Sequence, residues 1–190
     1  MATTFSFRET DSGKEFFYPH IQIIYSLVLN NLMRTEGIFV KEIRTEIVIK
    51  ASPVKIWKIL TNFERYPTWN PFIISIQGTL AAGNIIQVEL APPDAKRMKM
   101  KPRVLRVIPN QEFRWLGRIL IPGIFDGEHI FELRDNKNET TTVIQREIFT
   151  GILVPFLKKL LDDNTRRGFE SMNSELKKIC EANSEGIPGN

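Results

Sequence analysis

The sequence predicts an α+β fold, in which a curved antiparallel sheet wraps around one long C-terminal helix. Three observations lead to this prediction. Seven segments carry the short apolar runs and alternating patterns of β-strands, and two short helical segments follow the first of them. Tight turns join the later strands, which is typical of antiparallel sheets. After the last strand, apolar residues recur at helical spacing as far as residue 179.

Composition limits the functional classes. The chain has 190 residues, of which 42% are hydrophobic and 25% charged, and its net charge is +4. These values fit one ordinary domain with an extension. We find no basic run with interleaved aromatic residues, so no nucleic-acid partner is expected. Cys180 is the only cysteine, which favours a reducing, cytoplasmic location, and with only His20 and His129 as histidines we expect no metal and no cofactor.

Residues 1–40 form a separate N-terminal extension with one apolar segment in helical spacing. That segment, FFYPHIQIIYSLVLNNLM, is too short and too interrupted by polar residues to span a membrane. Two interpretations stay open: an extra helix packed on the domain, or a segment that contacts a membrane surface or a partner protein. Residues 41–182 form the main domain and residues 183–190 a flexible tail. The oligomeric state is open.

The main domain begins with a strand and a well-marked helix start. EIRTEIVIKA places Ile43, Ile47 and Ile49 on one face of the first strand. Ser52 is then a good helix N-cap, because Pro53 occupies the first helical position. A second short helical segment follows from Asn62 and ends within YPTWNPF.

Six further strands follow this helical region. Pro102 interrupts the third of them, which indicates a sheet edge or a bulge at that point. The predicted strands are FIISIQG, IIQVELA, MKMKPRVLRVI, EFRWLGRI, FDGEHIFEL and TTVIQREIF.

The last segment is a long amphipathic helix. Its apolar stripe runs from Leu153 to Ile179, with charged residues elsewhere on the helix surface. Gly168 lies in its middle, where glycine weakens a helix by about 1 kcal/mol relative to alanine. This glycine is either a kink or a position that leaves room beneath the helix.

A histidine in the interior marks the stretch 112–133. Alternation places His129 on the same side of its strand as Gly127, Phe131 and Leu133, which is the interior side. A buried imidazole needs a hydrogen-bond partner or a wet cavity. The stretch is therefore either part of a closed core or one wall of a ligand pocket.

These motifs together resemble the SRPBCC superfamily, and within it the polyketide cyclase/dehydrase-like group. The resemblance covers about residues 41–182 and rests on the Ser-Pro-x-x-x-Trp helix, YPTWNPF, FRWLG, FDGEHIFEL, QREIFTG and LLDDNTRRGFESMNSELK. The superfamily includes START-like lipid carriers and birch-pollen-allergen-like ligand binders. The resemblance implies a helix-grip fold, with a hydrophobic cavity between the seven-stranded sheet and the long helix.

His129 and Glu147 are the candidate catalytic residues, as a general acid and base. The alternative for His129 is a structural hydrogen bond to a neighbouring strand. Glu147 shares a face with Gln145 and Phe149, but alternation alone does not decide whether that face or the face of Ile144 and Ile148 points inward.

The candidate ligand-binding residues are those expected to line the cavity or its mouth. They are Trp69, Asn70, Met98, Met100, Phe113, Trp115, His129, Phe131, Gln145, Phe149, Gly168 and Met172. Three arginines sit on strands: Arg103, Arg114 and Arg118. Long cations at a strand end can hold a carboxylate or phosphate head group, but most are surface residues.

Three candidate functions follow from these residues and from the resemblance. The first is binding, sequestration or transport of a hydrophobic small molecule that is lipid, polyketide or isoprenoid-like. The second is a cyclase/dehydrase-type enzyme that uses His129 and Glu147. The third is an interaction module acting through residues 1–40. No nucleophile motif, phosphate-binding loop or metal-ligand spacing is present, so enzymatic activity is implied by the resemblance alone.

Overall fold

The computed structural model describes residues 39–119 and 121–182. The apolar segment of the N-terminal extension and the tail 183–190 lie outside the described residues. Within the described residues the predicted α+β architecture is confirmed, with antiparallel sheets packed against a long C-terminal helical segment. No helix among these residues is long and apolar enough to cross a membrane.

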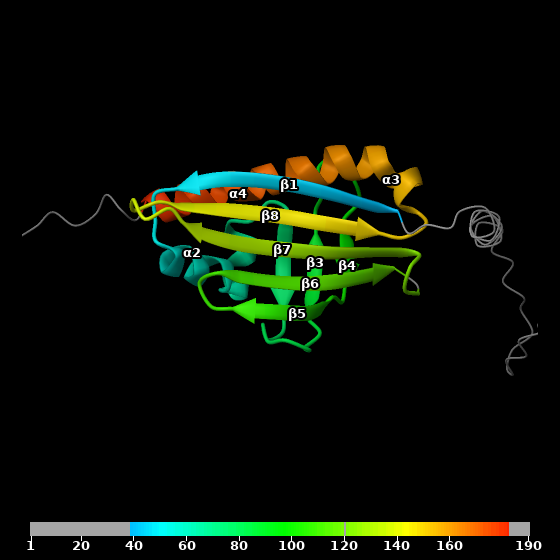
Figure 1. Ribbon diagram of the computed structural model, residues 1–190, viewed down its shortest axis with the longest axis horizontal. Helices are drawn as coiled ribbons and strands as arrows, with labels where there is room; N and C mark the ends of the chain where they lie inside the picture. Colours follow the sequence, from blue (N-terminus) through cyan, green and yellow to red (C-terminus); the bar gives the residue numbers. More distant parts are fainter. Residues whose placement is uncertain (1–38, 120, 183–190) are drawn as a thin grey trace, which may run out of the picture. The chain divides into compact units, whose positions relative to one another are not determined.

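Two antiparallel sheets form the body of the fold (Figure 1). The larger has five strands in the order β1-β8-β7-β6-β5, and the smaller has three in the order β2-β3-β4. The strands of the larger sheet are β1 (Val40–Ile49), β8 (Thr141–Thr150), β7 (Phe125–Asp135), β6 (Glu112–Ile119) and β5 (Arg103–Ile108). Those of the smaller sheet are β2 (Ile73–Gln77), β3 (Gln87–Leu90) and β4 (Met98–Met100).

Pro102 explains why eight strands are present where the sequence predicts seven. The segment predicted as one strand, 98–108, is divided at this proline into β4 and β5, which are edge strands of different sheets. An isolated bridge between Ile85 and Arg103 links the two sheets just beyond the break. The register also shifts between Val104 and Arg106, as expected for a bulge. The divided strand therefore lets the sheet turn sharply and enclose an interior.

The region between β1 and β2 begins with the helix that the sequence predicts. The N-cap Ser52 accepts a hydrogen bond from the Lys55 amide at 3.3 Å, and helix α2 (Pro53–Leu60) follows. The 3₁₀ helix η1 (Phe63–Thr68) comes next, and the Tyr66 hydroxyl donates to the Leu60 carbonyl at 2.7 Å. This bond ties the two short helices into one unit at one end of the sheets.

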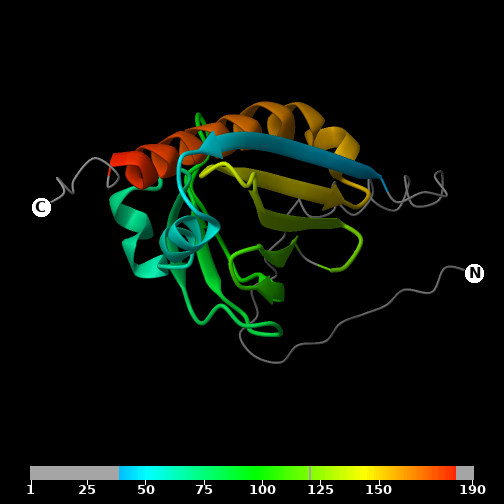
Figure 2. The same ribbon diagram turned by 60° about the vertical axis from the view of Figure 1, so that its left-hand side comes forward.

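The C-terminal helical segment runs along β1 (Figure 2). It consists of α3 (Val154–Leu160), the π-helical turn η2 (Leu161–Thr165) and α4 (Arg166–Ala182). Asn173 on α4 donates to the Thr45 hydroxyl on β1 at 3.0 Å, and both side chains are buried. The long helix predicted from the sequence is thus interrupted by one wider turn.

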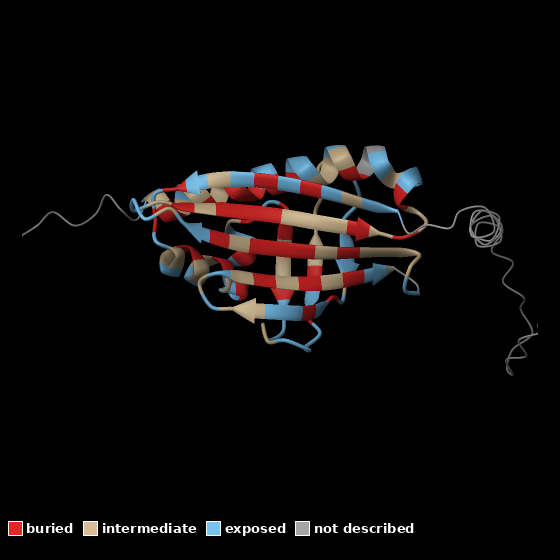
Figure 3. Ribbon diagram, in the orientation of Figure 1, coloured by how far each residue is buried: buried red, intermediate tan, exposed pale blue. Residues whose placement is uncertain are grey.

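The core lies between the inward faces of the sheets and α4. Buried residues are concentrated in the central strands β7 and β8, whereas the edge strands β1 and β5 are more exposed (Figure 3). Phe169, Met172 and Leu176 of α4 are fully buried. Cys180 is also buried, and this burial raises the pKa of its thiol to about 11.

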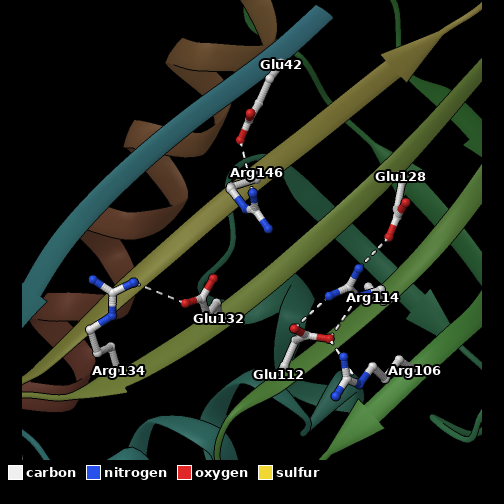
Figure 4. A network of polar contacts seen from close by, with 8 residues as sticks. All are labelled: Glu42, Arg106, Glu112, Arg114, Glu128, Glu132, Arg134 and Arg146. Atoms are coloured by element: carbon white, nitrogen blue, oxygen red, sulfur yellow. Dashed lines mark hydrogen bonds and ion pairs between the residues drawn. The ribbon is translucent and has the colours of Figure 1, made fainter. Parts of the chain in front are cut away.

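The outer face of the larger sheet carries a network of charges (Figure 4). Arg114 on β6 binds Glu112 at 2.7 Å and Glu128 at 2.9 Å. Ile130 and Ile144 lie on this same outward face, yet they are only 1% and 0% exposed. The aliphatic stems of the long charged residues can cover such side chains. The outer face is therefore apolar beneath a charged layer.

Candidate functional site

A cavity of about 100 Å³ opens on the inner face of the larger sheet. Six of the residues predicted from the sequence line it: Met98, Met100, Trp115, His129, Glu147 and Phe149. They come from β4, β6, β7 and β8, so the fold brings together residues up to 51 positions apart in the chain. The cavity is mainly apolar, and its buried polar group is the pair His129 and Glu147.

His129 and Glu147 face each other across β7 and β8. The register pairs the two residues directly, and Nδ1 of His129 lies 2.9 Å from Oε2 of Glu147. The side chains are 4% and 14% exposed, so this contact is shielded from bulk water. The sequence did not decide which face of β8 points inward, and the structure shows that it is the face that carries Glu147.

Gln145 contacts the other ring nitrogen of the histidine. Its amide nitrogen Nε2 lies 3.0 Å from Nε2 of His129 and 3.5 Å from Sδ of Met172. A thioether sulfur only accepts hydrogen bonds, so the amide NH₂ is the group that satisfies both neighbours. With this amide donating, Nε2 of His129 is the acceptor and Nδ1 carries the hydrogen of the neutral ring. Gln145 in this way orients the ring and selects its tautomer.

Aromatic side chains hold the imidazole in place. The His129 ring stacks on Phe131 with centroids 4.6 Å apart, and the centroids of Trp115 and Phe169 each lie 5.0 Å away. His129 is 3% exposed in this surround. The ring has almost no freedom to turn, because packed aromatic neighbours restrict its rotamers.

Gly127 makes room for the Glu147 carboxylate. A Cβ at Gly127 would lie 2.6 Å from Oε1 of Glu147, which is closer than nonbonded atoms approach. Gly127 pairs with Gly117 across β6 and β7, and both glycines line the cavity. The missing side chain of Gly127 thus leaves room for the carboxylate, and that of Gly117 leaves room beside Met100.

Several predicted ligand-binding residues lie behind the cavity wall instead of on it. Phe113 and Phe131 are packed in the aromatic cluster, and Gln145 and Met172 are fully buried behind His129. Gly168 lies under the ring of Phe72. Ligand contact by these residues stays a prediction.

Trp69 and Asn70 lie at the end of the fold near α2. Trp69 lines a separate surface hollow that also includes Lys58, Arg65 and Ile179. Asn70 is buried, and its Oδ1 accepts from the amides of Phe72 and Ile73 at 3.0 and 2.8 Å. Ligand contact by these two residues at the cavity mouth also stays a prediction.

The structure adds lining residues that sequence reasoning missed. Phe72, Leu90 and Pro92 come from the region of the smaller sheet, and Leu161 and Thr165 come from the π-helical turn. Alternation on β7 does indicate Phe125 and Gly127 as neighbours of His129 on the inward face. For the residues of the smaller sheet and of the turn, nothing in the local pattern marks a cavity, because their position depends on how the sheets fold over each other.

Arg118 stands at the rim. Its side chain is 51% exposed, and its Nε lies 3.6 Å from Oδ1 of Asp126 on the neighbouring strand. Among the described residues, no group of three histidine, cysteine or acidic side chains is arranged to hold a metal ion.

Solved structures with the same fold are numerous but distant in sequence. Norcoclaurine synthase of Thalictrum flavum is 12% identical, with a TM-score of 0.63, and the match covers 79% of this chain and 99% of that one. The di-domain ARO/CYC protein StfQ of the steffimycin biosynthetic pathway is also 12% identical with a TM-score of 0.63, and the match covers 77% of this chain and 52% of that one. A protein of Thermus thermophilus is 18% identical with a TM-score of 0.60 and coverages of 76% and 99%. At these identities the likeness shows the fold alone.

The family is shown by the sequence itself. No curated protein sequence matches the chain. The model of the family described as polyketide cyclase / dehydrase and lipid transport matches residues 41–181, which is most of the chain and nearly the whole range of the resemblance. With the helix-grip fold and the cavity described above, the chain belongs to this polyketide cyclase/dehydrase-like group of the SRPBCC superfamily.

Proposed function

We propose that this protein binds a hydrophobic small molecule in the cavity beside His129 and Glu147. The observation that carries the proposal is the lining: apolar and aromatic side chains surround one buried polar pair. Ligand pockets in proteins have this composition, with a large apolar wall for affinity and few polar groups for orientation. The family includes lipid-transport proteins by its description, which supports the same conclusion.

The size of the cavity favours a compact ligand. Its volume is about 100 Å³. An engineered apolar cavity of about 150 Å³ binds benzene, and this cavity is smaller, so its enclosed part holds a short chain or one side of a ring. A longer lipid, polyketide or isoprenoid would place one end here and extend towards the rim at Arg118 and Met98, which are both exposed.

A cavity-filling variant tests this proposal. Thr165 lies on the π-helical turn and lines the cavity, so Thr165→Trp should occupy it. Native mass spectrometry of the purified protein and displacement of an uncharged fluorescent probe, N-phenyl-1-naphthylamine, measure occupancy. We expect the wild-type protein to bind the probe and the variant to lose most of that binding.

Ser174→Trp is the matched control, because Ser174 is exposed on α4 and far from the cavity lining. It should bind the probe as the wild type does. Equal binding by wild type and Thr165→Trp, with both folded, would mean that the probe binds elsewhere and would contradict the proposal.

A second function is favoured by one specific observation, the orientation of Glu147 towards the cavity. A carboxylate that lies in an apolar cavity and is oriented by a histidine can act as a general base. The chemistry that this supports is proton abstraction next to a carbonyl group, the step on which cyclisation and dehydration of polyketide-like compounds depend.

Deuterium exchange tests this second function without knowledge of the natural substrate. Acetophenone in D₂O should exchange its methyl protons faster with protein present, as measured by NMR, and Glu147→Gln should abolish the acceleration while probe binding persists. Exchange at the buffer rate with the wild-type protein, or the same acceleration with Glu147→Gln, would remove the enzymatic alternative.

A further inference from the structure

The two oxygens of the Glu147 carboxylate have different surroundings. Oε2 lies 2.9 Å from Nδ1 of His129. Oε1 lies above Gly127, within the cavity lining, and accepts no hydrogen bond from any group among residues 39–119 and 121–182. A carboxylate in an apolar surround gains strongly from donors, and a charge-assisted bond to it is about twice as strong as a neutral one. This oxygen is a place for a donor that residues 39–119 and 121–182 do not supply.

The backbone around Glu147 keeps this oxygen accessible. Gly127 and Gly117 are paired across β6 and β7 and carry no side chain that could cover Oε1. A Cβ at Gly127 would displace the carboxylate, whereas a Cβ at Gly117 would meet only the flexible end of Met100 at 3.3 Å. Gly127, which pairs with Phe149 on β8, is therefore the glycine whose missing side chain makes room for the Glu147 carboxylate.

The charges at the cavity do not favour an anionic ligand. Arg118 is the one cation among the described residues that line it, and it lies at the rim with Asp126 beside it. Glu147 lies inside. A ligand carboxylate pushed into the cavity would meet a like charge in an apolar surround, where repulsion is poorly screened.

We propose that the cavity selects compact apolar ligands that carry a hydroxyl or N–H donor, which binds Oε1 of Glu147, and that it discriminates against carboxylate ligands. The inference rests on the proposed binding function and adds the chemical class of the ligand. Glu147 is then the residue that determines specificity, and His129 and Gln145 are the residues that position it.

Three matched probes test the inference: 4-ethylphenol, 4-ethyltoluene and 4-ethylbenzoate. They share ring and tail and differ in one group, which is a donor, a methyl group or an anion. Dissociation constants are measured on the full chain by NMR titration or calorimetry at neutral pH. A hydrogen bond to a charged acceptor should make the phenol bind roughly 10- to 100-fold more tightly than the toluene. The benzoate should bind most weakly of the three.

Two variants and two controls locate the effect. Glu147→Gln should reduce the preference for phenol over toluene at least about fivefold, because a charged hydrogen bond becomes a neutral one. Gly127→Ala should reduce it as well by displacing Oε1. Ser174→Ala, exposed on α4 and outside the cavity lining, and Glu132→Gln, on the outer face of β7, should leave the preference unchanged.

The outcomes separate this inference from the proposed function. Saturable binding of all three probes with equal affinity, or tightest binding of the benzoate, would overturn the donor selectivity and leave ligand binding intact. If Glu147→Gln keeps the preference for phenol, another residue causes that preference, and this result would also overturn the inference. Binding of none of them to a folded protein that also fails to bind the fluorescent probe would overturn both.

Discussion

The ring of Phe72 lies directly against the backbone of Gly168 in α4. A Cβ at Gly168 would be 2.3 Å from Cδ2 of Phe72, so the helix can approach the smaller sheet only because this position has no side chain. Of the two interpretations that the sequence left open for Gly168, the structure supports the one in which the glycine leaves room beneath the helix. Phe72 itself lines the cavity, so this contact also shapes the cavity.

Gly168→Ala should therefore destabilise the protein, against the usual trend for helices. At an exposed position, alanine stabilises a helix by about 1 kcal/mol relative to glycine. Here overpacking against Phe72 should outweigh that gain and lower the free energy of unfolding by about 1–3 kcal/mol. Urea denaturation followed by circular dichroism measures it.

Phe72→Leu provides the test of mechanism for this prediction. In the Phe72→Leu background the ring is gone, so Gly168→Ala should lower the free energy of unfolding much less than it does in the wild type. Equal costs in both backgrounds would show that Phe72 is not the cause.

Asn70→Ala should destabilise the turn that leads into β2. Asn70 Oδ1 accepts from two buried backbone amides, of Phe72 and Ile73. Their loss leaves two donors without a partner, and we expect a decrease of about 1–3 kcal/mol in unfolding free energy. Asn70→Asp retains an acceptor at the same place and should recover most of the stability. If Asn70→Asp is as unstable as Asn70→Ala in urea denaturation, the two hydrogen bonds are not the reason.

Arg114 should make the stability depend on pH through Glu112. The hydrogen bond from Arg114 lowers the pKa of Glu112, and Glu112 is 15% exposed. Because the folded-state pKa is below the unfolded one, the stabilisation is complete above the unfolded pKa of about 4.3 and is lost as the pH falls through the folded pKa. Arg114→Met should remove about 1 kcal/mol at pH 7 and less at pH 3.

Arg134→Met is the control for this pH dependence. Arg134 binds Glu132 on the same face of the sheet, but its side chain is 61% exposed. Such surface pairs contribute little. Thermal unfolding between pH 3 and 7 gives stability as a function of pH. The curve for Arg134→Met should run parallel to that of the wild type, and the curve for Arg114→Met should be flatter. Parallel curves for all three proteins would contradict the assignment.

Gln145 should determine the tautomer of His129. With Gln145 present, the ring should carry its hydrogen on Nδ1, and ¹⁵N–¹H correlation spectra of the imidazole distinguish the two neutral forms. Gln145→Leu leaves Nε2 of His129 without its donor and should increase the population of the Nε2–H form. Identical imidazole spectra for the wild type and the variant would mean that Glu147 alone sets the tautomer.

Local signals predicted the elements well. Ser52 and Pro53 start α2 as expected, because capping depends on residues within one turn. Pro102 marks the break in its segment, because proline cannot donate to a sheet. The extent of that break was not predictable, since whether a strand bends or passes into another sheet depends on contacts far away in the chain.

The orientation of β8 shows why alternation failed to place Glu147. An alternating strand can be assigned when one face is apolar and the other polar. On β8 the inward face holds Gln145 and Glu147, whereas the outward face buries Ile144 beneath charged side chains. Both faces therefore carry apolar and polar residues, and only the packing of the whole sheet distinguishes them.

The π-helical turn Leu161–Thr165 places α3 and α4 out of phase. A π-turn holds more residues than an α-turn, so the side chains before it are rotated by about 100° for each extra residue relative to those after it. Leu161 and Thr165 can face the cavity from this turn while Phe169 and Met172 still face the core. The number of residues in this turn therefore decides which helix side chains face the cavity. Deletion of Asp163 would restore a regular α-helix and rotate the side chains of α3 away from their present neighbours, although no residue of the sheets is changed.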